Sequence, residues 1–222
     1  PNGCGKSTLL SVMSRNNRPL EGQARLENRD LVEYKPKEFA KKFAIVYQQN
    51  DIPQDLTVEK LVMFGRMPYS SLLKKKTEED EEAVTWALSC TNLLDKREND
   101  LSALSGGERQ RVWIAMALAQ KSEILCLDEP TTYLDIYYQL ELLELVKELN
   151  DKHRLTIVMV LHDINQAIRY SNHVILMKSG QIVAEGTPRE VITKEVIKDV
   201  YGVNAVFHED EQLGLYMMPL SI

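Results

Sequence analysis

Short apolar runs alternate with amphipathic stretches through the second half of the chain. A regular alternation of strands and helices is typical of parallel βαβ units. The pattern therefore predicts an α/β fold with a mainly parallel sheet. The predicted elements are a helix from Gly106, a strand at 123–127, a helix at 136–152, a strand at 155–161, a helix at 164–170 and a strand at 173–177.

The first half of the chain carries shorter elements. We expect a short helix at 9–14, a small β-hairpin within 21–34, a helix at 36–42 and a buried strand at 43–47. The last strand of the second half is expected to lead through a tight turn at Ser179-Gly180 into a short strand at 181–184 and a helical tail from Thr187.

The stretch 56–104 interrupts the alternation, because it is mostly helical and has no strand pattern. Thr57 is expected to cap one helix, and Thr77 begins the capping box of a longer one. We therefore expect one domain in which a helical subdomain is inserted between two parts of a core, residues 1–55 and residues 105–222.

The composition is that of a globular protein with an acidic balance. Of 222 residues, 44% are hydrophobic and 27% are charged, and the formal net charge is −6. Nucleic acids and anionic lipid surfaces bind basic faces, so this balance argues against general binding of either.

The cysteines and the apolar runs argue against further classes of protein. Cys4, Cys90 and Cys126 are too scattered for a disulfide framework or a zinc site, and they fit a reducing compartment. The longest apolar run, at 156–161, has the length of a strand rather than of a bilayer crossing. If the protein serves a membrane process, we expect it to do so from the cytosolic side, through another chain.

The beginning of the chain carries the last positions of a phosphate-binding loop. Glycines let the backbone curl so that successive N–H groups point at phosphates, Lys6 adds a positive charge, and the Ser7 hydroxyl can ligate Mg²⁺. The following helix presents the positive end of its dipole to the same anions. A glycine-rich turn without a ligand is the alternative. The positions concerned are Asn2, Gly3, Cys4, Gly5, Lys6, Ser7 and Thr8.

A second candidate site lies where the strand at 123–127 ends in Asp128 and Glu129. A buried strand delivers Asp128 beside the phosphate loop, where it can hold Mg²⁺ directly or through water. Glu129 leaves the strand and can polarise the attacking water as a general base. Two solvated acids at a strand end have the same pattern, so this pair is a weak signal by itself.

A third motif is more specific. Ser105, Gly106, Gly107 and Glu108 open an apolar helix, and such a helix N-terminus is suited to receive an anion. Ser-Gly-Gly with a Gln at this spacing arises by chance in roughly one chain of this length in several hundred. A capped helix without a ligand is the alternative. The chain then has a second helix end suited to phosphate.

In their order along the chain, these motifs resemble those of ABC transporter ATPases, from Pro1 to about Val206. The likeness rests on the phosphate loop, Gln48 at a strand end, the Leu-Ser-Gly-Gly-Glu run at 104–108 with the following Gln110 and Arg111, the strand into Asp128-Glu129-Pro130, Tyr133-Leu134-Asp135, and His162.

The resemblance implies a role for each matching position. Residues 2–8 would grip ATP. Gln48 would touch Mg²⁺ and the attacking water and would sense the membrane subunit. The remaining implied roles are Mg²⁺ ligand for Ser7 and Asp128, catalytic base for Glu129, γ-phosphate contact for His162 and contact with the opposite subunit for Asp135.

The Ser105–Glu108 motif serves the ATP of a second copy in this family. The resemblance therefore implies a head-to-tail dimer with ATP between the subunits. Because only the γ-phosphate bridges both halves, hydrolysis removes the bridge. The helical block at 56–104 would transmit this closure to the membrane chain.

The resemblance also implies a fold and a setting. The fold is a P-loop NTPase (RecA-like) core over 1–222, with a mainly parallel sheet, a small antiparallel β part and the inserted helical subdomain. The cofactors are ATP and Mg²⁺. The partners are membrane permease subunits, a second ATPase copy in a homodimer and, indirectly, an extracytoplasmic substrate-binding protein, but no nucleic acid. The location is peripheral, on the cytoplasmic face of the cell membrane.

In this family the first glycine of the loop, the strand that feeds the loop and the aromatic residue that stacks on adenine all lie upstream of the position of Pro1. We therefore expect the sequence to be a fragment without its N-terminal strands. An open sheet edge and poor ATP affinity are expected of a molecule that begins at Pro1.

Softer likenesses favour ATPases of iron–siderophore, haem and cobalamin importers, and iron–siderophore import is the reading we favour. They lie at 56–62, at Gly65-Arg66-x-Pro68-Tyr69, and at 113–119, 130–136 and 160–167. Cargo is recognised by other chains, so haem, cobalamin or a metal ion remain alternatives. Two other classes stay open: a soluble ABC ATPase without a permease, and a nucleotide-gated binding module without turnover.

Overall fold

The computed structural model describes residues 1–48, 55–70, 76–210 and 214–222. Contacts between residues separate the chain into two compact units. Residues 11–160 form the larger unit, and residues 1–10 with 161–222 form the smaller one.

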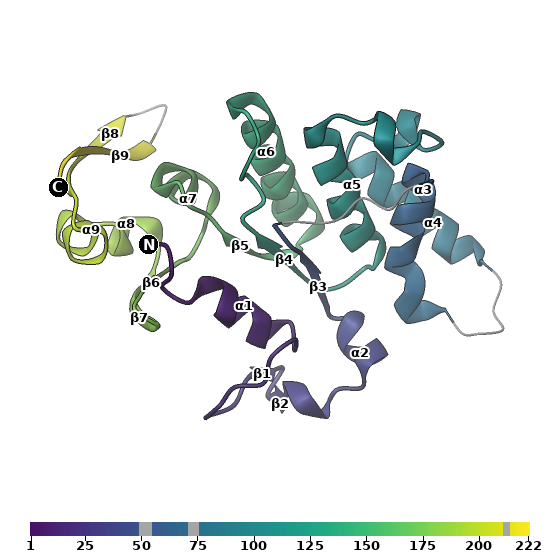
Figure 1. The fold of residues 1–222 in the computed structure, drawn as a ribbon, viewed down its shortest axis with the longest axis horizontal. Coiled ribbons are helices and arrows are strands. Elements are labelled where there is room, and N and C mark those ends of the chain that lie inside the picture. Colours follow the sequence, from purple (N-terminus) through teal and green to yellow (C-terminus); the bar gives the residue numbers. More distant parts are fainter. Residues whose placement is uncertain (49–54, 71–75, 211–213) are drawn as a thin grey trace. The chain divides into compact units, whose positions relative to one another are not determined.

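A parallel sheet of three strands lies at the centre of the larger unit (Figure 1). Its order is β3 (Phe43–Val46), β4 (Ile124–Asp128) and β5 (Thr156–Val160). Val46 pairs with Leu127, and Asp128 pairs with Val160, so the strands end at the same edge of the sheet. This confirms the predicted parallel α/β arrangement.

Long helices flank these strands in the sequence. The helix α5 (Gly106–Ala119) precedes β4, and α6 (Ile136–His153) connects β4 to β5. Apolar side chains at the spacing of one helix face attach α6 to the core. Its buried residues are Leu142, Leu143, Val146 and Leu149.

Helices also fill the part of 55–104 that the structure describes. The helices α3 (Val58–Met63) and α4 (Glu78–Cys90) contact α5 (Figure 1). Three short 3-10 helices complete this part: η2 (Phe64–Tyr69), η3 (Leu94–Lys96) and η4 (Leu101–Ala103).

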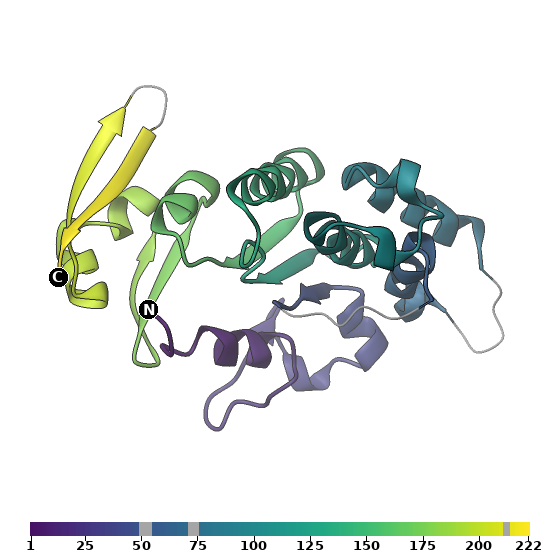
Figure 2. The same ribbon diagram turned by 45° about the horizontal axis from the view of Figure 1, so that its top comes forward.

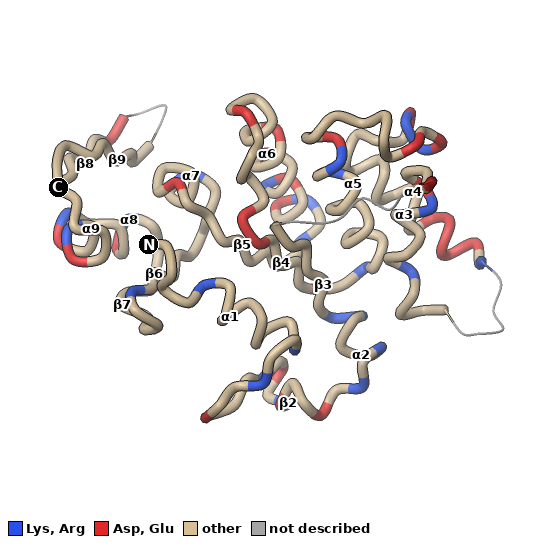
Figure 3. The backbone as a smooth tube through the Cα atoms, in the orientation of Figure 1, with Lys and Arg blue, Asp and Glu red and all other residues tan. Residues whose placement is uncertain are grey.

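Both predicted helix caps are confirmed. Thr57 accepts a hydrogen bond from the N–H of Lys60, and Thr77 forms a capping box with Asp80. The first turn of α4 is the acidic run drawn red in Figure 3, where negative charge meets the positive end of the helix dipole.

The small hairpin is also present in the larger unit. It consists of β1 (Arg25–Leu26) and β2 (Arg29–Asp30), which pair antiparallel. A 3-10 helix, η1 (Leu31–Glu33), and the helix α2 (Pro36–Ala40) connect this hairpin to β3.

The smaller unit contains a hairpin with a helix on each side of it in the sequence. The strands β6 (Val174–Lys178) and β7 (Gln181–Gly186) pair antiparallel around the predicted turn. The helices of this part are α7 (Ile164–Tyr170), α8 (Pro188–Val191) and α9 (Lys194–Tyr201), and α1 (Lys6–Met13) begins near the start of the chain.

The predicted helical tail from Thr187 is confirmed only as far as Tyr201, and beyond it the prediction is wrong, because the chain forms a second hairpin. Its strands, β8 (Asn204–Asp210) and β9 (Gly214–Ser221), are the long yellow arrows of Figure 2. The Asn165 side chain on α7 donates to the carbonyl oxygen of Met217 at 3.1 Å and accepts from its N–H at 2.8 Å. This pair of hydrogen bonds attaches the hairpin to α7.

No helix in the described ranges combines the length and apolar character that crossing a bilayer requires.

Candidate functional site

The phosphate loop has a backbone that favours glycine at two positions. Gly3 and Gly5 have φ angles of 70° and 100°, in the left-handed region. Lys6 is the first residue of α1, and the first N–H groups of a helix lack acceptors within it. The loop therefore ends in the helix N-terminus that the sequence predicts.

Lys6 folds back over this loop. Its ammonium donates to the carbonyl oxygen of Pro1 at 2.7 Å and lies 3.8 Å from Sγ of the buried Cys4. The N–H of Gly180 donates to the carbonyl oxygen of Cys4 at 3.0 Å, so the β6–β7 turn supports the loop. The positive charge of Lys6 is thereby kept at the loop, where an anion would need it.

Gln48 and Glu129 meet at the carboxyl edge of β3 and β4. Nε2 of Gln48 donates to Oε2 of Glu129 at 2.7 Å. The hydroxyl of Thr132 lies 3.4 Å from the same carboxylate oxygen and donates to it. The structure thus joins two of the residues predicted for catalysis. The neighbouring Gln49, the alternative to Gln48 in the sequence, lies outside the described residues.

Glu129 has an unusual backbone for a residue with a side chain. Its φ is 51°, which costs on the order of 1–3 kcal/mol and is typical of functional sites. A turn follows, in which the N–H of Thr132 donates to the carbonyl oxygen of Glu129 at 3.2 Å. The chain therefore leaves β4 abruptly at this position, and the carboxylate reaches Gln48.

Asp128 is the last residue of β4 and is half-buried. Asp128 and Gln48 are oxygen donors at the ends of neighbouring strands, and Mg²⁺ prefers oxygen ligands. In nucleotide sites this ion uses one or two protein ligands together with phosphates. The donors fit Mg²⁺ in type and number, although a larger His, Cys, Asp and Glu metal cluster is absent from the described ranges.

The predicted anion-binding turn at α5 has a complete capping box. Oγ of Ser105 accepts from the N–H of Glu108 at 3.3 Å, and the N–H of Ser105 donates to Oε2 of Glu108 at 2.8 Å. The ammonium of Lys96 donates to the other oxygen of Glu108. Lys96, and then the Ser105 N–H, lower the pKa of Glu108 to about 2, so that it is ionised at neutral pH.

Gly107 lies against an aromatic ring. A Cβ atom at this position would be 2.7 Å from Cδ1 of Tyr138, whereas a Cβ atom at Gly106 would meet open space. Asp135 caps α6 and accepts from the N–H of Tyr138 at 3.2 Å. The predicted dimer residue Asp135 therefore also caps the helical turn that places Tyr138 on Gly107.

His162 lies shortly after β5 and is exposed. The next residue, Asp163, caps α7 by accepting from the N–H of Gln166 at 2.9 Å. His162 and residues 1–8 belong to the smaller unit, and the other predicted site residues belong to the larger one.

Three contributors to the site are missed by sequence reasoning: Thr132, Lys96 and Tyr138. Thr132 is close to Glu129 in the chain, so its proximity to the strand end was the available signal. Lys96 and Tyr138 reach Glu108 and Gly107 through tertiary contacts, and no periodicity or motif spacing indicates them.

Comparisons with known proteins show the family of this chain. The model of a family described as ABC transporter matches residues 1–132. The chain is 49% identical to the probable siderophore transport system ATP-binding protein YusV of Bacillus subtilis (strain 168), over 96% of this chain and 78% of that protein. It is 45% identical to the ferric enterobactin transport ATP-binding protein FepC of Escherichia coli (strain K12), over 96% of this chain and 79% of that protein.

Solved structures have the same fold. A chain of an ABC transporter described as metal-chelate type, in an inward-facing conformation, matches with a TM-score of 0.85 and 27% identity, over 99% of this chain and 84% of that one. The dimeric ATP-binding cassette MJ0796 with ADP and Pi matches with a TM-score of 0.70 and 31% identity, over 85% of this chain and 83% of that one.

Proposed function

This chain belongs to the ABC transporter family as an ATP-binding subunit that hydrolyses ATP, and we propose that it serves an importer of iron–siderophore complexes. The names of its relatives in two bacteria support this cargo class. The chain itself holds the ATPase machinery, and the cargo is recognised by partner chains.

The observation that carries the catalytic proposal is the contact between Gln48 and Glu129. Glu129 is the general base, and Gln48 orients its carboxylate toward the attacking water. Asp128, Gln48 and the Ser7 hydroxyl would hold Mg²⁺, and a bound Mg²⁺ would supply positive charge beside the phosphates.

Residues 2–8 bind the phosphates of ATP through backbone N–H groups, the helix N-terminus and the Lys6 ammonium. His162 donates a hydrogen bond to the γ-phosphate. The Ser105–Glu108 turn completes the site of a second copy in a head-to-tail homodimer. Asp135 contacts that copy.

The remaining proposals concern the assembly. The core is formed by residues 1–55 and 105–222, and the helical subdomain at 56–104 passes dimer closure to the permease subunits. The protein is peripheral on the cytoplasmic face of the membrane, and an extracytoplasmic substrate-binding protein delivers the cargo to the permease.

Steady-state ATP hydrolysis tests the catalytic assignment. Glu129→Gln is expected to lower kcat by about a hundredfold or more, because the base is lost. Glu98→Gln is the matched control, since Glu98 is an exposed acid of the larger unit outside the site. Equal rates in wild type and Glu129→Gln would remove Glu129 as the base.

Uptake by cells tests the cargo. A strain without this ATPase should lose import of labelled iron–siderophore and should keep import of haem and cobalamin. Restoration by wild type, but not by Glu129→Gln, ties the uptake to hydrolysis. Loss of haem or cobalamin uptake in place of siderophore uptake would reject the proposed cargo and leave the ATPase assignment intact.

A further inference from the structure

The turn that is proposed to receive an anion carries an acid of its own. The Glu108 carboxylate accepts the Ser105 N–H at 2.8 Å, within the turn that would face the triphosphate of the second copy. An ionised carboxylate near a triphosphate weakens its binding by charge repulsion. The turn therefore requires a neighbouring cation that cancels the charge of Glu108.

Lys96 provides this cation. Its ammonium pairs with Oε1 of Glu108, while Oε2 of the same carboxylate caps Ser105. Only 16% of the Glu108 side chain is exposed, so water contributes little to screening it. Both oxygens of Glu108 are therefore occupied inside the subunit.

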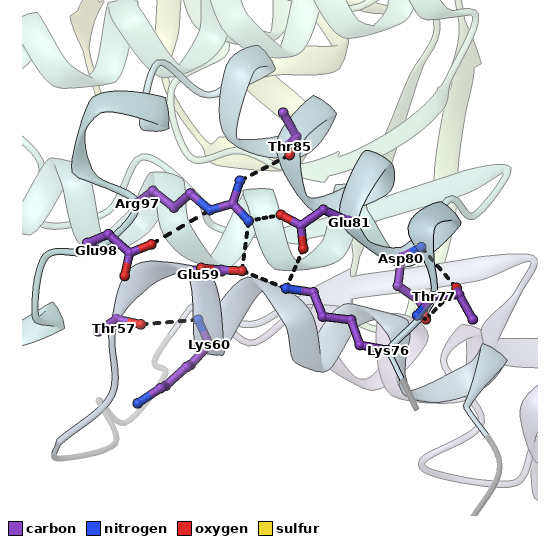
Figure 4. Close-up of polar contacts among 10 residues, drawn as sticks. All are labelled: Thr57, Glu59, Lys60, Lys76, Thr77, Asp80, Glu81, Thr85, Arg97 and Glu98. Carbon is purple, nitrogen blue, oxygen red and sulfur yellow. Dashed lines mark hydrogen bonds and ion pairs between the residues drawn. The ribbon is translucent and has the colours of Figure 1, made fainter. Parts of the chain in front are cut away.

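The residue after Lys96 anchors it to the helices of the same unit. Nη2 of Arg97 lies 2.7 Å from Oε1 of Glu59 on α3 and also pairs with Glu81 on α4. Nη1 of Arg97 donates to the hydroxyl of Thr85 at 3.2 Å. Figure 4 shows this network, in which Lys76 reaches the same two acids.

Backbone hydrogen bonds fix the same segment. The N–H of Glu59 donates to the carbonyl oxygen of Arg97 at 3.0 Å, and the N–H of Val58 donates to that of Asn99 at 3.0 Å. The segment that carries Lys96 is thus held between α3 and the start of α5. Its backbone position is fixed by packing and hydrogen bonds.

We propose that Lys96 is a positioning residue for the ATP of the second copy, because it cancels the charge of Glu108 and holds it in the capping box. The turn then presents no net negative charge to the γ-phosphate. This inference rests on the proposed function of the signature turn in trans.

The test is ATP hydrolysis by the protein assembled with its proposed permease. Lys96→Met is expected to raise the KM for ATP about tenfold, the scale of one uncompensated charge at close range, with a smaller change in kcat. Lys96→Arg should keep the wild-type KM. Lys60→Met is the matched control, because it removes an exposed lysine from α3.

Glu108→Gln distinguishes charge cancellation from a merely structural salt bridge. Under the proposal, Lys96→Met raises the KM for ATP in the wild-type background but leaves it unchanged in the Glu108→Gln background, since no charge is left there to cancel. If Lys96→Met raises the KM by the same factor in both backgrounds, Lys96 does not act through the charge of Glu108 and the proposal is overturned.

Ser105→Arg separates this inference from the proposed function. If Ser105→Arg abolishes hydrolysis while Lys96→Met has the KM of Lys60→Met, the role of Lys96 is wrong and the signature turn keeps its role. If Ser105→Arg hydrolyses ATP like wild type, the turn does not act on ATP, and both the trans assignment and the inference are overturned.

Discussion

Gln48 and Glu129 lie in contact at the carboxyl edge of the parallel sheet, with 2.7 Å between Nε2 and Oε2. The two residues are 81 positions apart in the chain and follow the ends of two neighbouring strands, β3 and β4. A carboxylate that activates water must be held in one orientation. The contact holds the carboxylate of the proposed base, Glu129, and connects it to the segment after β3.

Removal of this contact should lower turnover more than ATP binding. We expect Gln48→Ala to reduce kcat by roughly 10- to 100-fold with a smaller change in KM. A misplaced base stabilises the transition state less, whereas the binding of ATP in the ground state does not depend on it. Gln23→Ala, on the surface of the same unit, should match wild type. A rise in KM with unchanged kcat would assign Gln48 to ground-state binding instead.

Gly107 should not tolerate a methyl group. In Gly107→Ala the new Cβ would lie 2.7 Å from the Tyr138 ring, which is closer than two non-bonded carbon atoms approach each other. The turn or the ring must therefore move. We expect loss of ATP hydrolysis, measured at saturating ATP. Gly106→Ala is the control for space, since its Cβ would meet no atom within 4 Å.

A second substitution tests the steric reason for this loss. Tyr138→Ala in the Gly107→Ala background removes the ring that clashes, and we expect partial recovery of the rate. If the double variant hydrolyses ATP no faster than Gly107→Ala, the loss of activity arises at position 107 itself and not from a clash with Tyr138.

Arg66 should be important for the stability of the larger unit. It is 4% exposed, its Nε pairs with Asp80 at 2.9 Å, and its Nη1 donates to the carbonyl oxygen of Ala119 at 3.0 Å. Arg66→Met leaves the Asp80 carboxylate without this partner and is expected to lower the free energy of unfolding by about 3–5 kcal/mol. Urea unfolding measures this free energy. The control is Arg18→Met, which removes an exposed arginine and should change the free energy of unfolding by less than about 0.5 kcal/mol.

Glu59 should make the free energy of unfolding depend on pH in the acid range. Hydrogen bonds from Arg97 and then Lys76 lower the pKa of Glu59 from 4.5 to about 2. Because the folded pKa is the lower one, the stabilisation is complete above pH 4.5 and is lost as the pH falls from there toward 2. Solvent screening limits it to on the order of 1–2 kcal/mol.

Urea unfolding of wild type and Glu59→Gln over this pH range checks the sign. Wild type should be more stable at neutral pH, and the difference should shrink as the pH approaches 2. Glu21→Gln is the control, since Glu21 is an exposed acid of the same unit outside this network. A difference that grows on acidification would contradict the assigned pKa direction.

Local chemistry determined much of this protein from the sequence alone. The caps at Thr57 and Thr77 follow from hydroxyl groups that accept backbone N–H bonds, and the loop at Gly3 and Gly5 follows from backbone angles that favour glycine. The parallel strands follow from the alternation of apolar runs and helices. Each of these signals is contained within a short stretch of chain.

Pairing between distant segments was decided only by the tertiary structure. Periodicity shows that a segment is buried but does not identify its partner, so the Gln48–Glu129 contact, the Tyr138 ring on Gly107 and the pairing of Lys96 with Glu108 have no sequence signature.

The hairpin β8–β9 was not predicted from the sequence for the same reason. Its strands do not follow a clear alternation, because only part of one face is buried, and it is held to α7 by the side chain of Asn165. The sequence therefore determined which chemical groups this ATPase has, since each motif is local. Only packing, which acts across the chain, decided which groups meet.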